Sequence, residues 1–473
     1  RFSAEESWGE RDGNGDNTFS INLEKGKMYD VVMWYMNTEA DGYMNVTWKC
    51  GKTEATPNDF YLPESPDNFD VIPGKLNKET RVNSFRKPHH ISEIDVLNAD
   101  GKKYVYGLPA YNLKQREVSF SVDAVNGNPV EGKVTYNAAS GSNKDDSTTN
   151  TKGNEHYFNV EEIPPYAHSF FLTGIVSPDY VDITGDGITD DDAGNAVKFN
   201  YTKTAGKENP YKWRTPYTKS ASYNEGLKTD RRDDKGSYVY GEKELWYLNS
   251  IESKNMIALF KLGDREDLLP INQDGSKIRD SKQAKRLEEI NLYVKADYLN
   301  DSTKARPVKT VHFEYSYELC PGVNAPESNS GKLTLKKVWF SYNGNESKTN
   351  KARNQQNAYI FHYNSHNPGY DSKSFDRWGN YKSPDNNPQS SATNLVTNSE
   401  FPYALQDSAM AAKNAAAWTM DSIIMPSGGR MKITYESDDY AYVQNRRAGK
   451  MTHIAGFSTG RPQSVANLTN NLY

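Results

Sequence analysis

The chain has 473 residues, a formal net charge of −5 and a mean hydropathy of −0.87. A chain of this length divides into about two to four domains. The charge excludes a global basic field for nucleic acid or an anionic membrane, and no run approaches the roughly 18 apolar residues of a membrane-spanning helix.

Aromatic residues make up 12% of the chain, and 32 of the residues are Tyr. Disordered chains are poor in aromatics, whereas Tyr suits half-exposed strand faces. We therefore expect a folded, mainly β protein. Cys50 and Cys320 are the only cysteines. Two cysteines make neither a zinc site nor a disulfide framework, and the sequence leaves open whether they pair.

The first strong strand signal is a hairpin within residues 18–49. Two apolar, aromatic runs flank the polar segment Asn-Thr-Glu-Ala-Asp-Gly, and odd positions from Leu23 to Tyr35 predict one buried face. The segment INLEKGKMYDVVMWYMNTEADGYMNVTWKCG, followed by FYLP, resembles the closing half of a protective-antigen-type β-sandwich. The resemblance implies that residues 1–66 are the tail of an antiparallel sandwich. Members of that family often bind carbohydrate through loops that partly precede this segment, so we transfer no sugar site.

A second β domain is expected over residues 67–205. Residues 137–155 are polar, and residues 203–235 are charged, so both are expected to be exposed loops. Strands are predicted at Ile91–Val96, Lys103–Tyr106, Glu117–Val122, 156–175 and 197–202.

A Tyr-rich β region is expected over residues 206–457, followed by a polar tail over 458–473. Two segments are predicted to be helical, the charged Asp280–Glu289 and the Ala-rich Ala404–Trp418. The fold class is thus mainly β, a sandwich remnant followed by multi-stranded β domains with few short helices. Strands are predicted at Ser237–Tyr240, Leu245–Leu248, Met256–Leu262, Ile290–Val294, Thr310–Tyr317, Lys332–Tyr342, Tyr359–Tyr363 and Arg430–Tyr435.

A second resemblance rests on MDSIIMPSGGRMKITYESDDYAYVQ (420–444), a predicted strand, turn and strand. Pro426 fixes φ at the first corner, and Gly428 and Gly429 tolerate positive φ to reverse the chain. This segment is similar to hairpins of the Rhs/YD-repeat proteins of Bacteroidota. GKLTLKKVWFSYNGN (331–345), SFDRWGNYK (374–382) and YVYGLPAYN (104–112) also resemble that family.

The Rhs-like resemblance implies a large secreted protein whose Tyr-rich β stretches precede or form an encapsulating shell. It also implies export by the type 9 secretion system and hence an extracellular or cell-surface location. The expected partners are the other domains of the same polypeptide and the outer-membrane translocon. The chain begins at Arg1 without Met or a leader, so we expect a mature or excerpted segment.

The sharpest local motif is the acidic stretch DITGDGITDDD, which predicts a structural calcium site. Calcium takes six to eight oxygen ligands, and alternate residues of a tight loop supply them. Ala193 occupies position 12, where an EF-hand has Glu, so the stretch resembles shorter extracellular calcium loops instead. The alternative is an acidic turn without an ion. The predicted ligands are Asp182, Thr184, Asp186, the carbonyl of Ile188, and Asp190, with Asp191 or Asp192 as a further oxygen donor.

DGNGDNTFS is a weaker relative of that loop. Asp12, Asn14 and Asp16 occupy its first three ligand positions, and Asn17 replaces the glycine. Asn tolerates the left-handed conformation that this position needs. The sequence therefore gives a second candidate calcium site, again with a plain turn as the alternative.

No motif assembles a convincing active site. The sequence lacks a P-loop and an H-E-x-x-H helix. His362 and His366 lie on a strand running into a loop, where their spacing does not converge on one metal. Asp376, Arg377 and Trp378 form either a structural corner or an aromatic binding site.

We therefore expect a non-catalytic scaffold segment of a large exported protein, beside a toxin or adhesin module. The second interpretation is an adhesin module that binds surface glycans. The third is a hydrolase, although no pair among the 62 acidic residues stands out as catalytic. No nucleic acid and no membrane span are expected.

Overall fold

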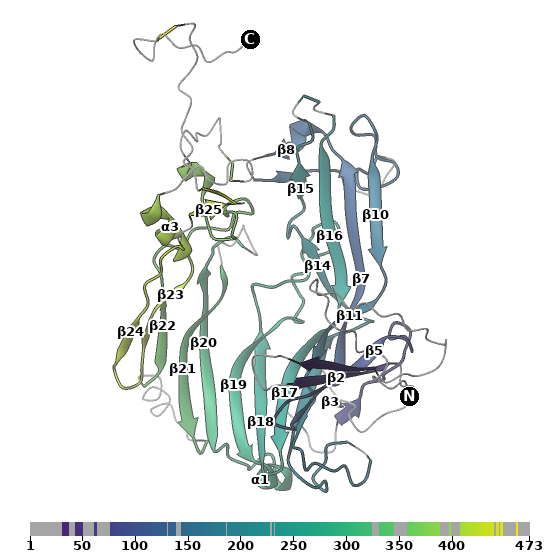
Figure 1. The fold of residues 1–473 in the computed structure, drawn as a ribbon, viewed down its shortest axis with the longest axis vertical. Coiled ribbons are helices and arrows are strands. Elements are labelled where there is room, and N and C mark those ends of the chain that lie inside the picture. The colour runs from purple at the N-terminus through teal and green to yellow at the C-terminus, as the bar shows by residue number, and fades with distance from the viewer. Residues whose placement is uncertain are drawn as a thin grey trace.

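The computed structural model describes residues 31–36, 43–50, 61–63, 76–129, 131–138, 143–185, 187–227, 229–230, 232–323, 331–344, 357–387, 397–398, 407–438, 441–443, 445–447 and 460–461. The chain is mainly β and forms two large antiparallel sheets, which confirms the predicted class (Figure 1). Among the described residues the α-helices are α1 (Lys295–Asn300) and α3 (Ser408–Ala415).

The larger sheet has 14 strands and begins with the expected hairpin of β1 (Val31–Met36) and β2 (Tyr43–Cys50). β2 pairs with β5 (Ile91–Leu97), so the hairpin extends the edge of this sheet. The strands that follow in spatial order are β6 (Lys103–Tyr106), β12 (Gly174–Val176), β13 (Ala196–Ala205), β17 (Leu245–Ser253), β18 (Met256–Asp264), β19 (Lys285–Val294), β20 (Lys309–Leu319), β21 (Lys332–Tyr342), β22 (Tyr359–Tyr363), β23 (Met420–Ile424) and β24 (Arg430–Lys432).

The second sheet is built around two long strands, β7 (Leu108–Ser121) and β16 (Lys235–Lys243). In Figure 1 it stands upright on the right, while the larger sheet curves along the bottom and up the left side. Its other strands are β10 (Phe158–Ile163), β11 (Tyr166–Phe171), β14 (Tyr211–Thr215), β15 (Ala221–Asn224), β9 (Lys133–Val134) and β8 (Gly127–Asn128). Two small hairpins pair β3 (Tyr61–Pro63) with β4 (Leu76–Lys78) and β25 (Tyr442–Val443) with β26 (Arg446–Arg447).

Among the described residues the chain passes between the two sheets at four places, and two of these crossings lie next to each other. Gly107 joins β6 to β7, and Glu244 joins β16 to β17. Each of these two crossings uses a single residue, so the sheets are continuous through the backbone. The amide of Glu244 donates to the carbonyl oxygen of Tyr111 at 2.9 Å, which ties the two crossings together.

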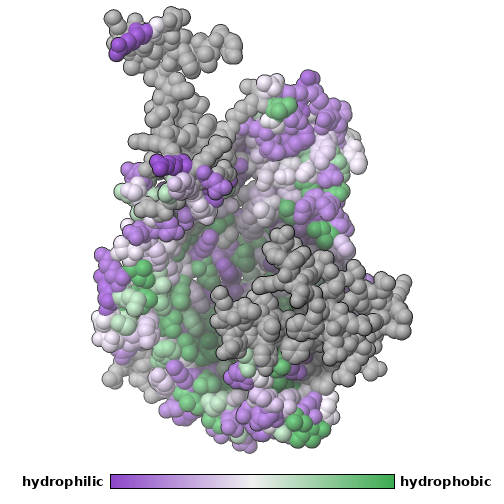
Figure 2. Space-filling view, in the orientation of Figure 1, coloured by the Kyte–Doolittle hydropathy of each residue, from purple (hydrophilic) through white to green (hydrophobic). Residues whose placement is uncertain are grey.

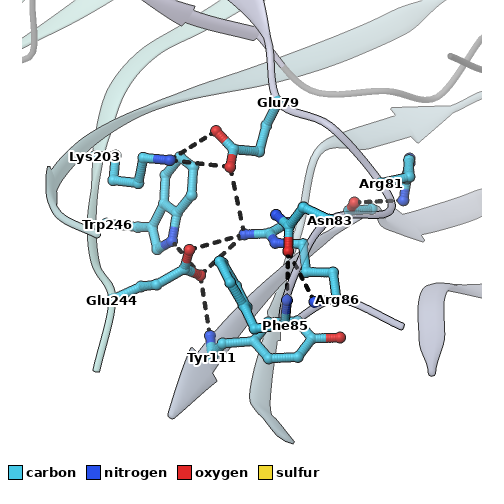
Figure 3. Close-up of polar contacts among 10 residues, drawn as sticks. Glu79, Arg81, Asn83, Phe85, Arg86, Tyr111, Lys203, Glu244 and Trp246 are labelled. Atoms are coloured by element: carbon cyan, nitrogen blue, oxygen red, sulfur yellow. Dashed lines mark hydrogen bonds and ion pairs between the residues drawn. The ribbon is translucent and has the colours of Figure 1, made fainter. Parts of the chain in front are cut away.

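A buried ion pair fills this junction (Figure 3). The Nη2 of Arg86 lies 2.9 and 3.1 Å from the two carboxylate oxygens of Glu244, and both side chains are at most 1% exposed. The same carboxylate accepts the amide of Tyr111 at 3.1 Å and the indole N–H of Trp246 at 3.2 Å. Each oxygen of Glu244 is thereby satisfied, as a buried charge requires.

Further charged side chains surround that pair. Lys203 donates to both oxygens of Glu79 at 2.8 and 2.9 Å, and Glu79 lies 3.8 Å from Arg86. Nearby, Arg81 pairs with Glu93 at 3.0 Å with both side chains 2% exposed, and it donates to the carbonyl of Gly107. The crossing points are therefore held by side chains from residues 79–86.

The hydrophobic cores are separate clusters that differ in size. The second sheet has its own core, and the junction has a smaller one around Leu108 and Trp246. A third core lies under α1, where Tyr298 packs on Ile257 and Leu259. By contrast, no residue of β19 is buried. The members of the core of the second sheet include Val118, Phe120, Val122, Val134, Ala221, Tyr238 and Tyr240.

Three local predictions were wrong. Residues 280–284 are irregular and 285–289 belong to β19, because pairing with β18 overrides a weak helical propensity. The expected loop over 203–235 contains β14 and β15. In the expected exposed loop over 137–155, a few polar side chains are buried, because Asn150 donates to the carbonyl oxygens of Ser121 and Asp145.

The other predicted strands from β5 onward are found, and α3 lies within the predicted segment 404–418. The expected domain boundary after residue 205 falls at the end of β13, and both sheets take strands from either side of it. Cys320 is a buried free thiol. None of the described helices is long and apolar enough to cross a membrane.

Replacing Glu244 with Gln is expected to cost about 3–5 kcal/mol of unfolding free energy. The change removes the carboxylate that pairs with the buried Arg86 at 2.9 Å and leaves only Glu79, at 3.8 Å and already paired with Lys203. Urea unfolding of the full chain measures this. The matched control is Lys102→Met, which breaks an exposed pair with Asp100 (51% and 43% exposed) and is expected to change stability by less than about 1 kcal/mol. Equal losses in the two variants would contradict a special role for the junction.

Candidate functional site

The acidic loop lies between β12 and β13 and is closed by a bridge between Val181 and Ala193. The carboxylate of Asp182 accepts the amides of Gly185 at 2.7 Å and Gly187 at 3.2 Å. Both glycines have positive φ, 76° and 104°, which glycine adopts at no steric cost. The loop is therefore wrapped around the side chain of its first predicted ligand.

Asp192 is the second organising carboxylate of the loop, although it was expected only as an alternative to Asp191 for a further oxygen donor. It accepts hydrogen bonds from the hydroxyl of Tyr180 and the amide of Thr189, both at 2.8 Å, and from the amide of Ile183 at 3.2 Å. Burial favours the protonated acid, but these three donors outweigh it and lower the pKa of Asp192. Asp192 therefore stays ionised inside the loop.

Asp190 faces lysine instead of the loop centre. Its carboxylate lies 2.6 Å from the Nζ of Lys295, which also lies 3.3 Å from Glu252. Burial favours the neutral amine, but the two carboxylates raise the pKa of Lys295. Lys254 donates to the backbone oxygen of Asp192 at 3.3 Å. The loop is thus docked on a basic patch that sequence reasoning did not find.

Of the remaining predicted ligands, Thr184 and Ile188 lie within the described residues. Thr184 is exposed, and the side chain of Ile188 packs against Gly174 of β12. Asp186, Asp12, Asn14 and Asp16 lie outside the described residues. In the part of the chain that the structure describes, no three His, Cys, Asp or Glu side chains gather closely enough to hold a metal ion.

The larger sheet carries a polar row that crosses four strands. The strand register aligns Lys261 of β18, Glu289 of β19, His312 of β20 and Trp339 of β21. Glu289 lies 3.4 Å from both Lys261 and His312, and the imidazole stacks on the indole at 5.2 Å. His312 also bonds Ser341 at 2.8 Å. Only cross-strand pairing assembles this row.

Glu289, His312 and Ser341 have the order of groups that activates a serine nucleophile in hydrolases. A cavity of about 320 Å³ is lined by Glu289, His312 and Trp339 among others. Ser341 itself is only 3% exposed within β21. At this exposure the Ser341 hydroxyl is not open to a substrate carbonyl. The three side chains instead form polar contacts that join neighbouring strands.

The opposite face of the same strands is apolar. One register row consists of Phe260, Ile290, Val311 and Phe340, and the next contains Phe313, Val338 and Tyr359. Tyr359 is 37% exposed, and the other six are only half-buried. Figure 2 shows hydrophobic residues gathered over the concave side of β19–β21. These seven residues are called the apolar face below.

Two sequence motifs form tight turns, the expected 420–432 hairpin and the 374–382 corner, which was one of two alternatives. In the 420–432 hairpin, the amide of Met425 donates to Gly429 at 2.8 Å, and Gly428 has φ of 83°. Gly429 does not have a positive φ, so only Gly428 adopts the conformation that favours glycine. In the 374–382 corner, Asp376 accepts the amides of Trp378 and Asn380 at 2.9 Å.

The remaining candidate groups are separate. Trp378 at the tip of that corner is 54% exposed. His366 contacts Asn414 and Tyr381, whereas His362 lies within β22. The two histidines thus have different surroundings and do not form a shared site.

Comparison with known proteins adds little. No protein-family model matches the chain, and no curated protein matches it. Among solved structures, the crystal structure of TcdB2-TccC3 is similar at 9% identity and a TM-score of 0.22, over 74% of this chain. The chain spans 18% of that chain's length. A TM-score this low supports no inference about fold or function.

Glu289→Gln is expected to remove a pH-dependent part of the stability. The hydrogen bond with His312 is the largest cause that lowers the pKa of Glu289 from 4.5 to about 2. A depressed acid pKa stabilises the fold above about pH 4.5, and this contribution disappears as the pH falls toward 2. The loss is expected to be about 2 kcal/mol at pH 7, because the carboxylate is a quarter exposed and partly screened.

Unfolding free energies at pH values from 2 to 7 measure this effect. Glu318→Gln is the matched control, since Glu318 pairs with Lys336 on the same sheet but is 43% exposed. A wild-type advantage over Glu289→Gln that stays constant between pH 2 and 5 would contradict the assignment.

Proposed function

We propose that this chain is a non-catalytic structural segment of a larger exported protein, part of a β-walled scaffold beside a toxin or adhesin module. The observation that carries the proposal is the apolar face. It belongs to a single layer of strands, and no residue of β19 is buried on either side of that layer. A wall of this kind is completed by further protein packed against it.

The contrast between the two faces supports this proposal. The polar rows satisfy their own groups across strands, as between Thr310 and Asn291 at 2.7 Å. The apolar face presents Phe260, Phe313 and Phe340 instead, only half-buried. Soluble monomers rarely expose contiguous apolar patches larger than a few hundred Å². Other domains of the same polypeptide are the partner that we propose for this face.

The Rhs-like motifs agree with a shell role. Their Pro-Ser-Gly-Gly turn forms a regular hairpin at the end of the large sheet, where β23 and β24 close the strand series. On the same resemblance, we propose an extracellular or cell-surface location and export through the type 9 translocon. The absence of catalytic function is part of the proposal, and the inaccessible Ser341 supports it.

The isolated chain is expected to bind 1-anilinonaphthalene-8-sulfonate and to self-associate at micromolar concentration, because the apolar face lacks its cover. Phe313→Asn and Tyr359→Asn, which lie in one register row, are expected to weaken both effects severalfold. Lys337→Asn on the opposite face is the control. Fluorescence and sedimentation velocity give the two measurements. A wild-type chain that stays monomeric without binding dye would sink the proposal.

We further propose that the acidic loop takes up calcium as a structural ion. The observation that favours this is the fixed carboxylate of Asp182 inside two glycine turns. Asp190 is engaged by Lys295 at 2.6 Å, so calcium would compete with this lysine for the carboxylate. Extracellular calcium modules bind with Kd values of about 10⁻⁴–10⁻³ M, which sets the expected affinity.

With a Kd of about 10⁻⁴ M, 1 mM calcium is expected to stabilise the chain by about 1.4 kcal/mol. Asp182→Asn is expected to abolish this gain, and Lys295→Met to tighten binding by releasing Asp190. Calorimetric titration and thermal melting after chelation provide the measurement. Asp100→Asn, a change at an exposed turn, is the control. Identical calcium responses in wild type and Asp182→Asn would show that the loop is an ordinary turn.

A further inference from the structure

The second sheet carries a polar cavity of about 330 Å³ that no sequence motif indicated. It lies where two covering segments meet over β16. Ala138, Lys144 and Asp146 come from the segment that follows β9, and Tyr240 comes from β16. The third wall is the 272–274 turn, held by a bridge between Ile271 and Lys277. Ligand sites of small molecules begin at about this size.

The carboxylate of Asp146 is fixed at the wall of this cavity. Its side chain is 2% exposed, and it accepts the hydroxyl of Tyr238 at 2.7 Å. That hydroxyl accepts the side-chain amide of Gln273 at 2.8 Å, and Gln273 accepts from Arg116 at 3.1 Å. Burial raises the pKa of Tyr238, so the phenol stays protonated and donates. The relay holds Asp146 in place before any ligand arrives.

Hydrogen-bonding capacity remains inside the cavity. Lys144 lies 3.2 Å from Asp146 and is 32% exposed, so its ammonium has further donors. Ser276 engages Oδ1 of Asp274 through its amide and hydroxyl at 2.9 and 2.6 Å. Within the described residues, Oδ2 of Asp274 receives no hydrogen bond. The cavity thus offers carboxylate acceptors from two segments beside one cationic donor.

We propose that this cavity binds a neutral saccharide unit. Two carboxylates accept hydrogen bonds from neighbouring hydroxyls, and the Lys144 ammonium donates to a ring or hydroxyl oxygen of the same unit. An anion would meet the carboxylates of Asp146 and Asp274, which repel it. An apolar ligand would leave the same buried groups without partners. The proposal is independent of the scaffold role, which rests on the apolar face of the other sheet.

The test is a titration of the full chain with D-galactose, D-mannose, N-acetyl-D-glucosamine and lactose, followed by saturation-transfer NMR and calorimetry. At least one sugar is expected to bind with a Kd of about 1 mM or below. Asp274→Asn and Lys144→Met are each expected to weaken that binding at least about tenfold, the effect of one charged hydrogen bond. Both positions border solvent, and melting curves check that the variants remain folded.

Asp301→Asn, an exposed carboxylate paired with Lys304 far along the chain, is the matched control and is expected to bind like wild type. Inorganic phosphate and spermidine serve as anionic and cationic probes. Absence of binding by all four sugars would overturn the proposal. So would unchanged affinity in both cavity variants, or preferential binding of phosphate or spermidine at this cavity.

Discussion

The buried pair between Arg86 and Glu244 is the interaction on which the two-sheet arrangement depends. Glu244 is the single residue that joins β16 of one sheet to β17 of the other, and its carboxylate also accepts from Tyr111 and Trp246. A charge at such a position costs solvation energy, which only a complete set of partners offsets. Arg86 supplies the counter-charge from a segment outside both sheets. The relative direction of the sheets is therefore set by polar contacts at a crossing, with only a small apolar core beside it.

Away from this junction, the larger sheet continues as a single layer with two dissimilar faces. On one face, Lys261, Glu289, His312 and Trp339 form a row whose members satisfy one another across strands. On the other, phenylalanines and aliphatic residues lie only half-buried. A face that satisfies itself needs no cover, whereas an apolar face gains free energy when it is covered. This asymmetry favours a wall that is completed by additional protein.

Charged groups serve as structural supports throughout the chain. Asp192 and Asp182 organise the acidic loop by accepting backbone amides, and Lys295 neutralises the outer carboxylates. Asp146 is fixed similarly beneath the polar cavity of the second sheet. A chain with few large apolar cores holds its long loops by such hydrogen bonds.

The sequence by itself determined what short-range physics controls. Alternating Tyr-rich strands, the turn at Gly428 and the Asp376 corner depend on neighbours a few residues apart, and each is found in the fold. The sequence-based prediction was wrong where distant partners decide the secondary structure. Residues Lys285–Glu289 pair with β18 and do not form the predicted helix. The row through His312 and the hydrogen bonds that lead to Asp146 join residues separated by 23 to 157 positions. Strand order brings those groups together, and strand order depends on packing between distant segments, which local patterns do not encode.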